Sequence, residues 1–374
     1  MKKFIVIGGG ILGASTAFHL AKAGEEVLLV DRQDAGQGTD AAAGIICPWL
    51  SQRRNKAWYS LAKSGASYYS SLIQQLEEVG EAETGYKRVG AVSLHMDEGK
   101  LAKMEERARK RREDAPEVGE ICQISKTATS DLFPPVGPDY SSVYISGAAR
   151  VNGRELRNAL IRAAKKNGAL VREGSAQLLL DGDRIVGIRI RDEEIFADTI
   201  IITAGAWASE LLEPIGIHLQ VKGQKAQIIH LQLEDVETSD WPVVMPPNDQ
   251  YILAFEGGRI VMGATHEDDK EFDLRVTAGG LAEILHKALS VAPGLNDGEF
   301  AEARVGYRPF TPGFLPIIGE VPGVEGLFLA NGLGASGLTV GPFLGWQMAK
   351  LVTEGSGSLD IDLDLYDVSQ AIIS

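Results

Sequence analysis

The chain has 374 residues, of which 44% are hydrophobic and 24% are charged. This balance is typical of an ordered protein of about two to three domains and excludes a largely disordered chain. The net charge of −14 disfavours nucleic acids and anionic membranes as partners. Cys47 and Cys122 show no metal-binding or C-x-x-C spacing, so we expect no metal site and a reducing, cytoplasmic environment.

The first 31 residues carry the pattern of a dinucleotide-binding unit. An apolar strand pattern runs into Gly8, Gly10 and Gly13, spaced as G-x-G-x-x-G, and a helix pattern follows. Gly8 permits a tight turn, Gly10 lets a pyrophosphate approach the backbone, and Gly13 lets the helix pack closely on the strand. Asp31 ends the next apolar run, where its carboxylate can bind ribose hydroxyls but would repel the 2′-phosphate of NADP. This motif alone leaves NAD and FAD open.

The same segment also resembles a signal peptide, because residues 4–21 are uncharged and follow Lys2 and Lys3. Three consecutive glycines interrupt the apolar run, however, and Lys22 falls in what would be the cleavage region. No later run is long and apolar enough to span a bilayer. We therefore expect a cytoplasmic protein without a transmembrane segment.

Apolar periodicity predicts the elements that follow. Residues 116–142, rich in Pro, Ser and Asp, are expected to form a loop. The basic cluster ERARKRRED is interpreted as a solvated helix face rather than a docking patch. The turn DGD and the alternation in RIVGIRI indicate a hairpin. Strands are expected at 89–96 and within 221–265, and helices at 56–79, 98–114, 151–168 and 277–291.

Three further segments have the small residues of a ligand-binding turn. GTDAAAGI is a loop against which a flat ring could lie. In TIIITAGAWAS, an apolar strand ends at Ala204, Gly205 and Trp207, at the carboxyl end where a doubly wound sheet exposes backbone to ligands. In NGLGASGLTVGP, a turn precedes a helix whose N-terminus favours an anion.

Together and in this order, these segments resemble the FAD-dependent amino-acid oxidase family, most closely its glycine oxidase and D-amino-acid dehydrogenase branch. The resemblance spans essentially the whole chain and also rests on QVKGQKAQ, RIVMGAT and VGYRPFTPGFLPIIG. It implies an α/β fold with a doubly wound, Rossmann-like FAD-binding domain and a second domain built on an antiparallel sheet that binds substrate. The FAD-binding domain would comprise residues 1–85, 147–220 and 301–374, and the substrate domain residues 86–146 and 221–300.

The resemblance also assigns cofactor-binding residues. FAD would be bound non-covalently, because neither cysteine lies in the late glycine segments. Cys47 is interpreted as a small apolar packing residue rather than a reactive thiol. The cofactor-binding residues would be Gly8, Gly10, Gly13, Asp31, Arg32, Gly38, Thr39, Ala43, Gly44, Ile45, Ala176, Ala204, Gly205, Trp207, Gly334, Ser336, Gly337, Leu338 and Thr339.

Two residues are assigned to the substrate on the same basis. Arg308 would clamp the substrate carboxylate, since a guanidinium fork matches a carboxylate bidentately, and Tyr251 would hydrogen-bond the same group. Ala335 replaces an arginine of glycine oxidases, which weakens the case for glycine itself and leaves room for a bulkier substrate. His266 is interpreted as a solvated residue rather than a substrate contact.

The implied reaction is oxidation of the C–N bond of a small amino acid or N-substituted glycine by hydride transfer to flavin, followed by hydrolysis of the imine. Oxygen, a quinone or another electron carrier could accept the electrons, so oxidase and dehydrogenase both stay open, and a homo-oligomer is possible. The alternatives are a subunit of a sarcosine- or L-proline-type amine dehydrogenase, a non-catalytic flavoprotein partner, and an NAD-dependent dehydrogenase. The last would not explain the two late glycine turns.

Overall fold

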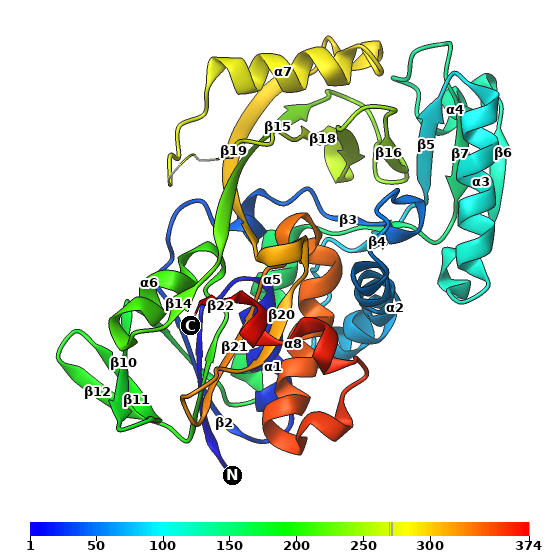
Figure 1. The fold of residues 1–374 in the computed structure, drawn as a ribbon. Coiled ribbons are helices and arrows are strands. Elements are labelled where there is room, and N and C mark those ends of the chain that lie inside the picture. The colour runs from blue at the N-terminus through cyan, green and yellow to red at the C-terminus, as the bar shows by residue number, and fades with distance from the viewer. Residues whose placement is uncertain (269, 271, 374) are drawn as a thin grey trace.

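The computed structural model describes residues 1–268, 270 and 272–373 (Figure 1). Its lower half is built on a six-stranded sheet in which all neighbours are parallel except β20 and β21. From β1 the chain moves outward through β2 to β9 on one side and through β13 to β21 on the other, so the predicted doubly wound topology is confirmed. In spatial order the strands are β20 (Ile317–Glu320), β21 (Leu327–Asn331), β13 (Thr199–Ile202), β1 (Lys3–Ile7), β2 (Glu26–Asp31) and β9 (Leu170–Glu173).

Both faces of this sheet are buried. Phe4 and Val6 of β1 face the helices α1, α5 and α8, whereas Ile5 and Ile7 pack against a three-stranded antiparallel sheet and α6. This burial explains why the parallel strands are apolar on both sides. The covering elements are α1 (Ile11–Lys22), α5 (Gly153–Lys166), α8 (Gly337–Glu354), α6 (Ala208–Leu212), β10 (Ala176–Asp181), β11 (Arg184–Ile190) and β12 (Glu193–Phe196).

The upper half holds an eight-stranded sheet that is antiparallel except where β16 pairs with β5. Helix α7 (Ala278–Leu289) covers one face through Ile284 and Ala288, and α2 (Lys56–Glu78) lies beside the lower half (Figure 1). In spatial order the strands are β19 (Glu299–Phe310), β15 (Lys222–Gln232), β18 (Arg259–Gly263), β17 (Tyr251–Ala254), β16 (Val243–Met245), β5 (Ala91–His95), β7 (Ser141–Ile145) and β6 (Ile121–Ile124). A small three-stranded sheet has the order β3 (Ile45–Ile46), β8 (Ala149–Arg150) and β4 (Lys87–Arg88), and a two-stranded one consists of β14 (His218–Leu219) and β22 (Ile372–Ile373).

The division into two domains at the predicted residues stays a prediction. Strand β19 spans the predicted boundary at residue 301 and pairs with β15 along its length. We propose that the boundary follows residue 310, since a sheet strand belongs with the sheet that it extends.

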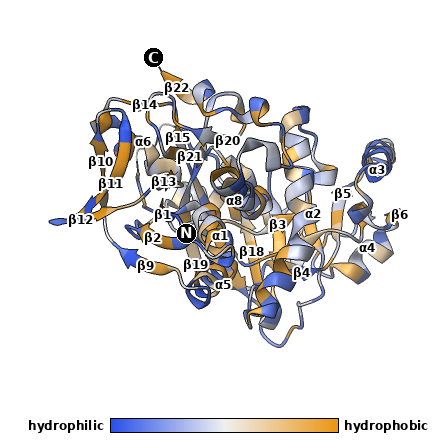
Figure 2. Ribbon diagram, turned by 90° about the horizontal axis from the view of Figure 1, so that it is seen from below, coloured by the Kyte–Doolittle hydropathy of each residue, from blue (hydrophilic) through white to orange (hydrophobic). Residues whose placement is uncertain are grey.

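The four predicted helices are present, and Asn152 caps α5 by accepting hydrogen bonds from the N–H groups of Arg154 and Glu155. The basic cluster lies on α3 (Glu98–Arg112), which is largely hydrophilic in Figure 2, as expected of a solvated helix face. The loop predicted over 116–142 was wrong in part, because this segment contains β6, α4 (Lys126–Leu132) and the start of β7. Ser125 starts α4 by accepting a hydrogen bond from the N–H of Ala128, a capping signal hidden in a Ser-rich stretch.

Burial of His19 in α1 makes stability depend on pH. His19 Nδ1 lies 2.7 Å from the Ser15 carbonyl oxygen and its Nε2 lies 2.6 Å from the Tyr68 hydroxyl, so both nitrogens are satisfied in the neutral ring. Burial lowers the pKa of His19 to about 4. Between about pH 6.5 and pH 4 the unfolded chain therefore binds more protons than the folded one, and acidification destabilises the fold.

Because His19 is protonated more readily in the unfolded chain, we expect the free energy of unfolding to fall by up to about 3 kcal/mol between pH 7 and pH 4. His19→Gln should flatten the acid limb of a plot of Tm against pH, whereas His218→Gln, at an exposed position, should leave it unchanged. Equal slopes of Tm against pH in the wild type and in His19→Gln would contradict the assignment of this pH dependence to His19.

Candidate active site

The turn between β1 and α1 is compact around its glycines. Gly8 has a φ of +107°, and a Cβ placed at Gly13 would lie 1.8 Å from the Gly8 carbonyl oxygen. The Thr203 hydroxyl also donates to this oxygen at 2.8 Å, which ties the turn to the end of β13. Gly10 caps α1 without a side chain, and the first turn of the helix carries no acidic residue. The helix N-terminus is therefore suited to an anion such as a pyrophosphate.

Asp31, at the end of β2, is held by neighbouring donors. Its carboxylate accepts hydrogen bonds from the N–H groups of Gly9 and Gln33 and, at 3.0 Å, from Gln37 Nε2. The neighbouring Arg32 forms ion pairs instead, because its guanidinium lies 2.7 Å from the Asp34 carboxylate and 3.0 Å from the Glu210 carboxylate. The structure thus places both predicted residues at the same end of the site.

The small-residue loop after Asp31 lies directly against β19. Tyr307 N–H donates to the Gly36 carbonyl oxygen at 2.9 Å, and a Cβ at Gly38 would lie 2.8 Å from the Tyr307 carbonyl oxygen. The Thr39 hydroxyl accepts a hydrogen bond from Ile11 N–H at 3.0 Å. Only small residues permit this approach, which brings the first loop, the α1 N-terminus and β19 together.

The remaining predicted segments join the same region. A Cβ at Gly44, where φ is +97°, would lie 1.8 Å from the Val151 carbonyl oxygen. The Thr339 hydroxyl at the start of α8 donates to the Ile45 carbonyl oxygen at 2.9 Å. Asn331, at the end of β21, donates to the Gly205 carbonyl oxygen at 2.8 Å. Segments far apart in sequence are therefore cross-linked by hydrogen bonds around one space.

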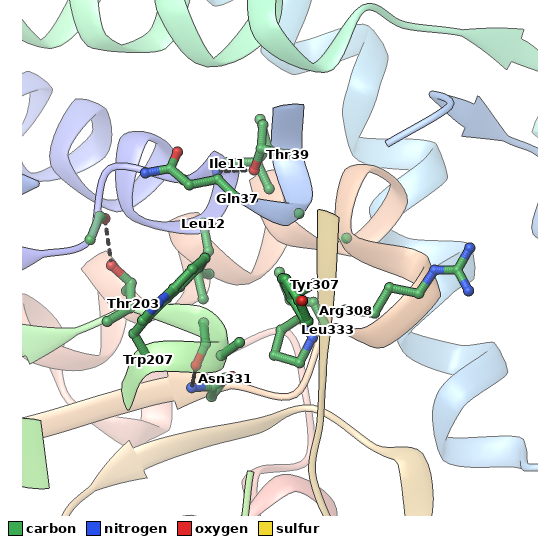
Figure 3. Close-up of a pocket in the computed structure, with 18 of the residues that line it drawn as sticks. Ile11, Leu12, Gln37, Thr39, Thr203, Trp207, Tyr307, Arg308, Asn331 and Leu333 are labelled. Carbon is green, nitrogen blue, oxygen red and sulfur yellow. Dashed lines mark hydrogen bonds between the residues drawn. The ribbon is translucent and has the colours of Figure 1, made fainter. Parts of the chain in front are cut away.

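That space is a cavity of about 790 Å³ (Figure 3). Gly13 and Ser336 do not line it, since Gly13 packs against the β1 turn and Ser336 accepts a hydrogen bond from Trp58 Nε1. The other predicted residues do, and they are Gly8, Gly10, Asp31, Arg32, Gly38, Thr39, Ala43, Gly44, Ile45, Ala176, Ala204, Gly205, Trp207, Tyr251, Arg308, Gly334, Gly337, Leu338 and Thr339.

Arg308 lies on the cavity wall opposite Trp207, and its guanidinium extends away from that indole in Figure 3. Its Nη1 donates to Gln224 Oε1 at 3.1 Å and to the Thr265 carbonyl oxygen at 3.4 Å. Burial lowers the pKa of Arg308. Burial also raises the pKa of the Tyr251 hydroxyl, and the neighbouring Arg308 opposes this rise. The two predicted substrate residues are thus adjacent, with the phenol kept protonated.

His266 and Ala335 also line the cavity. Loss of solvation and the charge of Arg308 lower the pKa of His266, so its imidazole is neutral near pH 7. The prediction that His266 is solvated agrees with its exposed side chain, but His266 also lines the cavity, which was not predicted. Asp249, a further lining residue, pairs with Lys287 at 2.9 Å.

Sequence reasoning missed Gln37, Thr203 and Asn331, which line the cavity and hold its walls. Thr203 directly follows β13 and Asn331 ends β21, so their position at the carboxyl ends of parallel strands was the available signal. Cys47 is buried, which raises the pKa of its thiol to about 12 and makes it unreactive. Neither cysteine lines the cavity.

The walls fit FAD. A helix N-terminus and glycine backbone lie at one part of the cavity, a carboxylate at the end of β2 lies nearby, and two further small-residue turns extend the space toward Arg308. The family model described as FAD dependent oxidoreductase matches residues 3–351. The chain belongs to this family. It is therefore an FAD-dependent oxidoreductase, and the predictions of family, enzyme class and cofactor are confirmed.

Individual relatives can be aligned with this chain over nearly its full length. The chain is 60% identical over 373 residues to "Uncharacterized oxidoreductase YurR" of Bacillus subtilis, with all of both chains covered. It is 45% identical to the solved iminodiacetate oxidase of Chelativorans sp. BNC1, with a TM-score of 0.94 and coverage of 97% of this chain and 98% of that one. It is 30% identical to the glycine oxidase of Pseudomonas aeruginosa, with 91% of this chain and 92% of the relative covered.

In the described part of the chain, no helix is both long and apolar enough to cross a membrane. Within those same residues, no group of three or more His, Cys, Asp or Glu side chains is placed to hold a metal ion.

Proposed function

We propose that this enzyme oxidises the C–N bond of an N-substituted glycine whose carboxylate is bound by Arg308 and Tyr251. The observation that carries the proposal is the free charge of Arg308. Arg32 and Arg308 are the arginines among the described residues that line the cavity, and only Arg32 pairs with carboxylates. A largely buried guanidinium without an acidic partner is unfavourable unless an anionic ligand completes it, which supports a carboxylate substrate.

The rest of the cavity would hold the cofactor. The Gly8–Gly10 backbone and the N-terminus of α1 would meet the pyrophosphate, and Asp31 the adenosine ribose. Residues 38–45 and the turn at 334–339 would border the flavin ring. FAD, when bound, supplies the two-electron acceptor for the oxidation.

Arg308 and Tyr251 would then fix the orientation of the substrate. The guanidinium offers parallel N–H donors to both carboxylate oxygens, and the protonated phenol of Tyr251 can donate to one of them. Holding the carboxylate at this wall fixes the position of the adjacent Cα–H bond. His266, neutral near pH 7, adds no competing charge beside the clamp.

Ala335 supports a substituent on the amine nitrogen of the substrate. This short side chain lines the cavity in the turn before α8, so it leaves space in the cavity that a longer side chain would fill. Iminodiacetate, after which the 45% identical iminodiacetate oxidase is named, is itself an N-substituted glycine. Both observations favour a secondary amine over glycine.

Anaerobic reduction of the bound flavin tests the proposal. Iminodiacetate, sarcosine and L-proline should be compared with glycine and D-alanine by following the loss of flavin absorbance. We expect the N-substituted substrates to bleach the flavin with the higher ratio of rate to Kd. Preferential reduction by glycine or D-alanine would refute the substrate class. Readmission of air to the reduced enzyme then separates an oxidase, which reoxidises rapidly, from a dehydrogenase, which needs a quinone or another carrier.

A further inference from the structure

We infer that Gln224, itself held by Asp268, is a positioning residue that orients Arg308 and keeps its charge available for the substrate. The inference rests on the proposed role of Arg308. Gln224 lies on β15 directly opposite Arg308 on β19, in the register that pairs these two strands. Residues opposite each other on neighbouring strands are close enough for their side chains to interact. The pair is therefore fixed by the sheet rather than by a flexible loop.

The side chain of Gln224 uses both ends of its amide. Its Oε1 accepts a hydrogen bond from Arg308 Nη1 at 3.1 Å, and its Nε2 donates to Asp268 Oδ1 at 2.9 Å. The carboxylate of Asp268 therefore sets which way the amide points, with the oxygen toward Arg308. A reversed amide would place an NH₂ group against the guanidinium.

Asp268 is in turn held next to β15 by the backbone. Lys225 and Glu267 exchange hydrogen bonds between N–H and carbonyl groups, each at 3.0 Å, in an antiparallel bridge. Gln227 N–H donates to the Thr265 hydroxyl at 2.9 Å. The segment that carries Asp268 also supplies the Thr265 carbonyl oxygen, the second acceptor for Arg308 Nη1. The segment 265–268, held against β15 by these hydrogen bonds, thus contacts the guanidinium directly through Thr265 and indirectly through Asp268 and Gln224.

The geometry leaves Arg308 ready for a ligand. The guanidinium also interacts with the Tyr251 hydroxyl. Gln224 Oε1 and the Thr265 carbonyl both engage Nη1, so donors on Nη2 and Nε can meet a carboxylate beside Tyr251. The choice of an amide matters as well. A glutamate at position 224 would place a negative charge about 3 Å from Nη1 and would compete with the substrate carboxylate for the same cation. The neutral amide holds the guanidinium without neutralising it.

Acetate binding to the FAD-loaded enzyme tests this inference, with the perturbation of the flavin spectrum as the measurement. We expect Gln224→Glu to raise the Kd of acetate about 100-fold and Gln224→Ala about 10-fold. Asp268→Asn, at an exposed position where folding is not at risk, should raise it several-fold. In turnover, KM should rise by similar factors while the limiting rate of flavin reduction changes less. Gln220→Glu adds the same charge at an exposed position just before β15 and should leave both values unchanged.

A merely structural role predicts the opposite ranking, because alanine removes both hydrogen bonds whereas glutamate is nearly isosteric. Gln224→Ala binding acetate more weakly than Gln224→Glu would therefore overturn the inference, as would wild-type Kd values in Gln224→Glu and Asp268→Asn. If Arg308→Ala also leaves acetate binding intact, the proposed function fails too. If Arg308→Ala abolishes acetate binding while the Gln224 and Asp268 variants do not weaken it, the positioning role of Gln224 is refuted and the proposed role of Arg308 stands.

Discussion

Arg308→Ala is expected to lower kcat/KM about 10²-fold to 10³-fold, equivalent to about 3–4 kcal/mol of transition-state binding. The reason is that the substrate carboxylate would enter a largely buried site without its counter-charge, and removing one partner of a buried charged pair is costly. Arg308→Lys should show a smaller loss, because it keeps the charge but not the planar fork. Steady-state kinetics with the best substrate from the anaerobic comparison would measure both effects.

The cofactor provides the internal control for this variant. Arg308 lies at the opposite wall from Trp207, a predicted cofactor-binding residue, so the FAD content of Arg308→Ala should match the wild type. Arg189→Ala, an arginine on β11 that pairs with Glu194 and does not line the cavity, should retain full activity. Wild-type kinetics in Arg308→Ala would show that another group binds the substrate.

The glycine turn in the part of the cavity proposed to bind the cofactor could be predicted from sequence because its signals are local. The spacing of Gly8, Gly10 and Gly13 between a strand and a helix is a property of one short segment, and the structure places that segment as expected. Asp31 follows from the same unit. Even here the structure separates two roles, since Gly13 packs against the Gly8 carbonyl and only Gly8 and Gly10 line the cavity.

The substrate half depends on contacts between distant segments. Arg308 and Tyr251 were assigned through a family resemblance, because nothing in their own neighbourhoods shows that β19 and β17 bring them together. The chain from Arg308 to Gln224 and Asp268 was not predictable, since it needs the register of β15 against β19 and the turn after β18. Side-chain pairs across strands follow from tertiary packing, which a single sequence does not specify.

Gly13→Ala is expected to destabilise the fold by about 3 kcal/mol or more and to weaken FAD binding about 100-fold, because the added methyl has nowhere to go. Its Cβ would lie 1.8 Å from the Gly8 carbonyl oxygen and 2.4 Å from the Thr203 hydroxyl. Relief requires α1 to move off β1, which would break the 2.8 Å hydrogen bond from Thr203 to Gly8 and displace the helix N-terminus proposed to meet the pyrophosphate.

Thermal unfolding with and without added FAD, together with FAD titration of the apoprotein, would measure these effects of Gly13→Ala. Gly279→Ala is the matched control, since Gly279 is also helical but a Cβ there meets no atom within 4 Å. That change should be neutral or stabilise by up to about 1 kcal/mol, because alanine favours a helix over glycine. If Gly13→Ala instead keeps wild-type Tm and FAD affinity, the close packing of α1 on the β1 turn is not what holds the cofactor end of the cavity together.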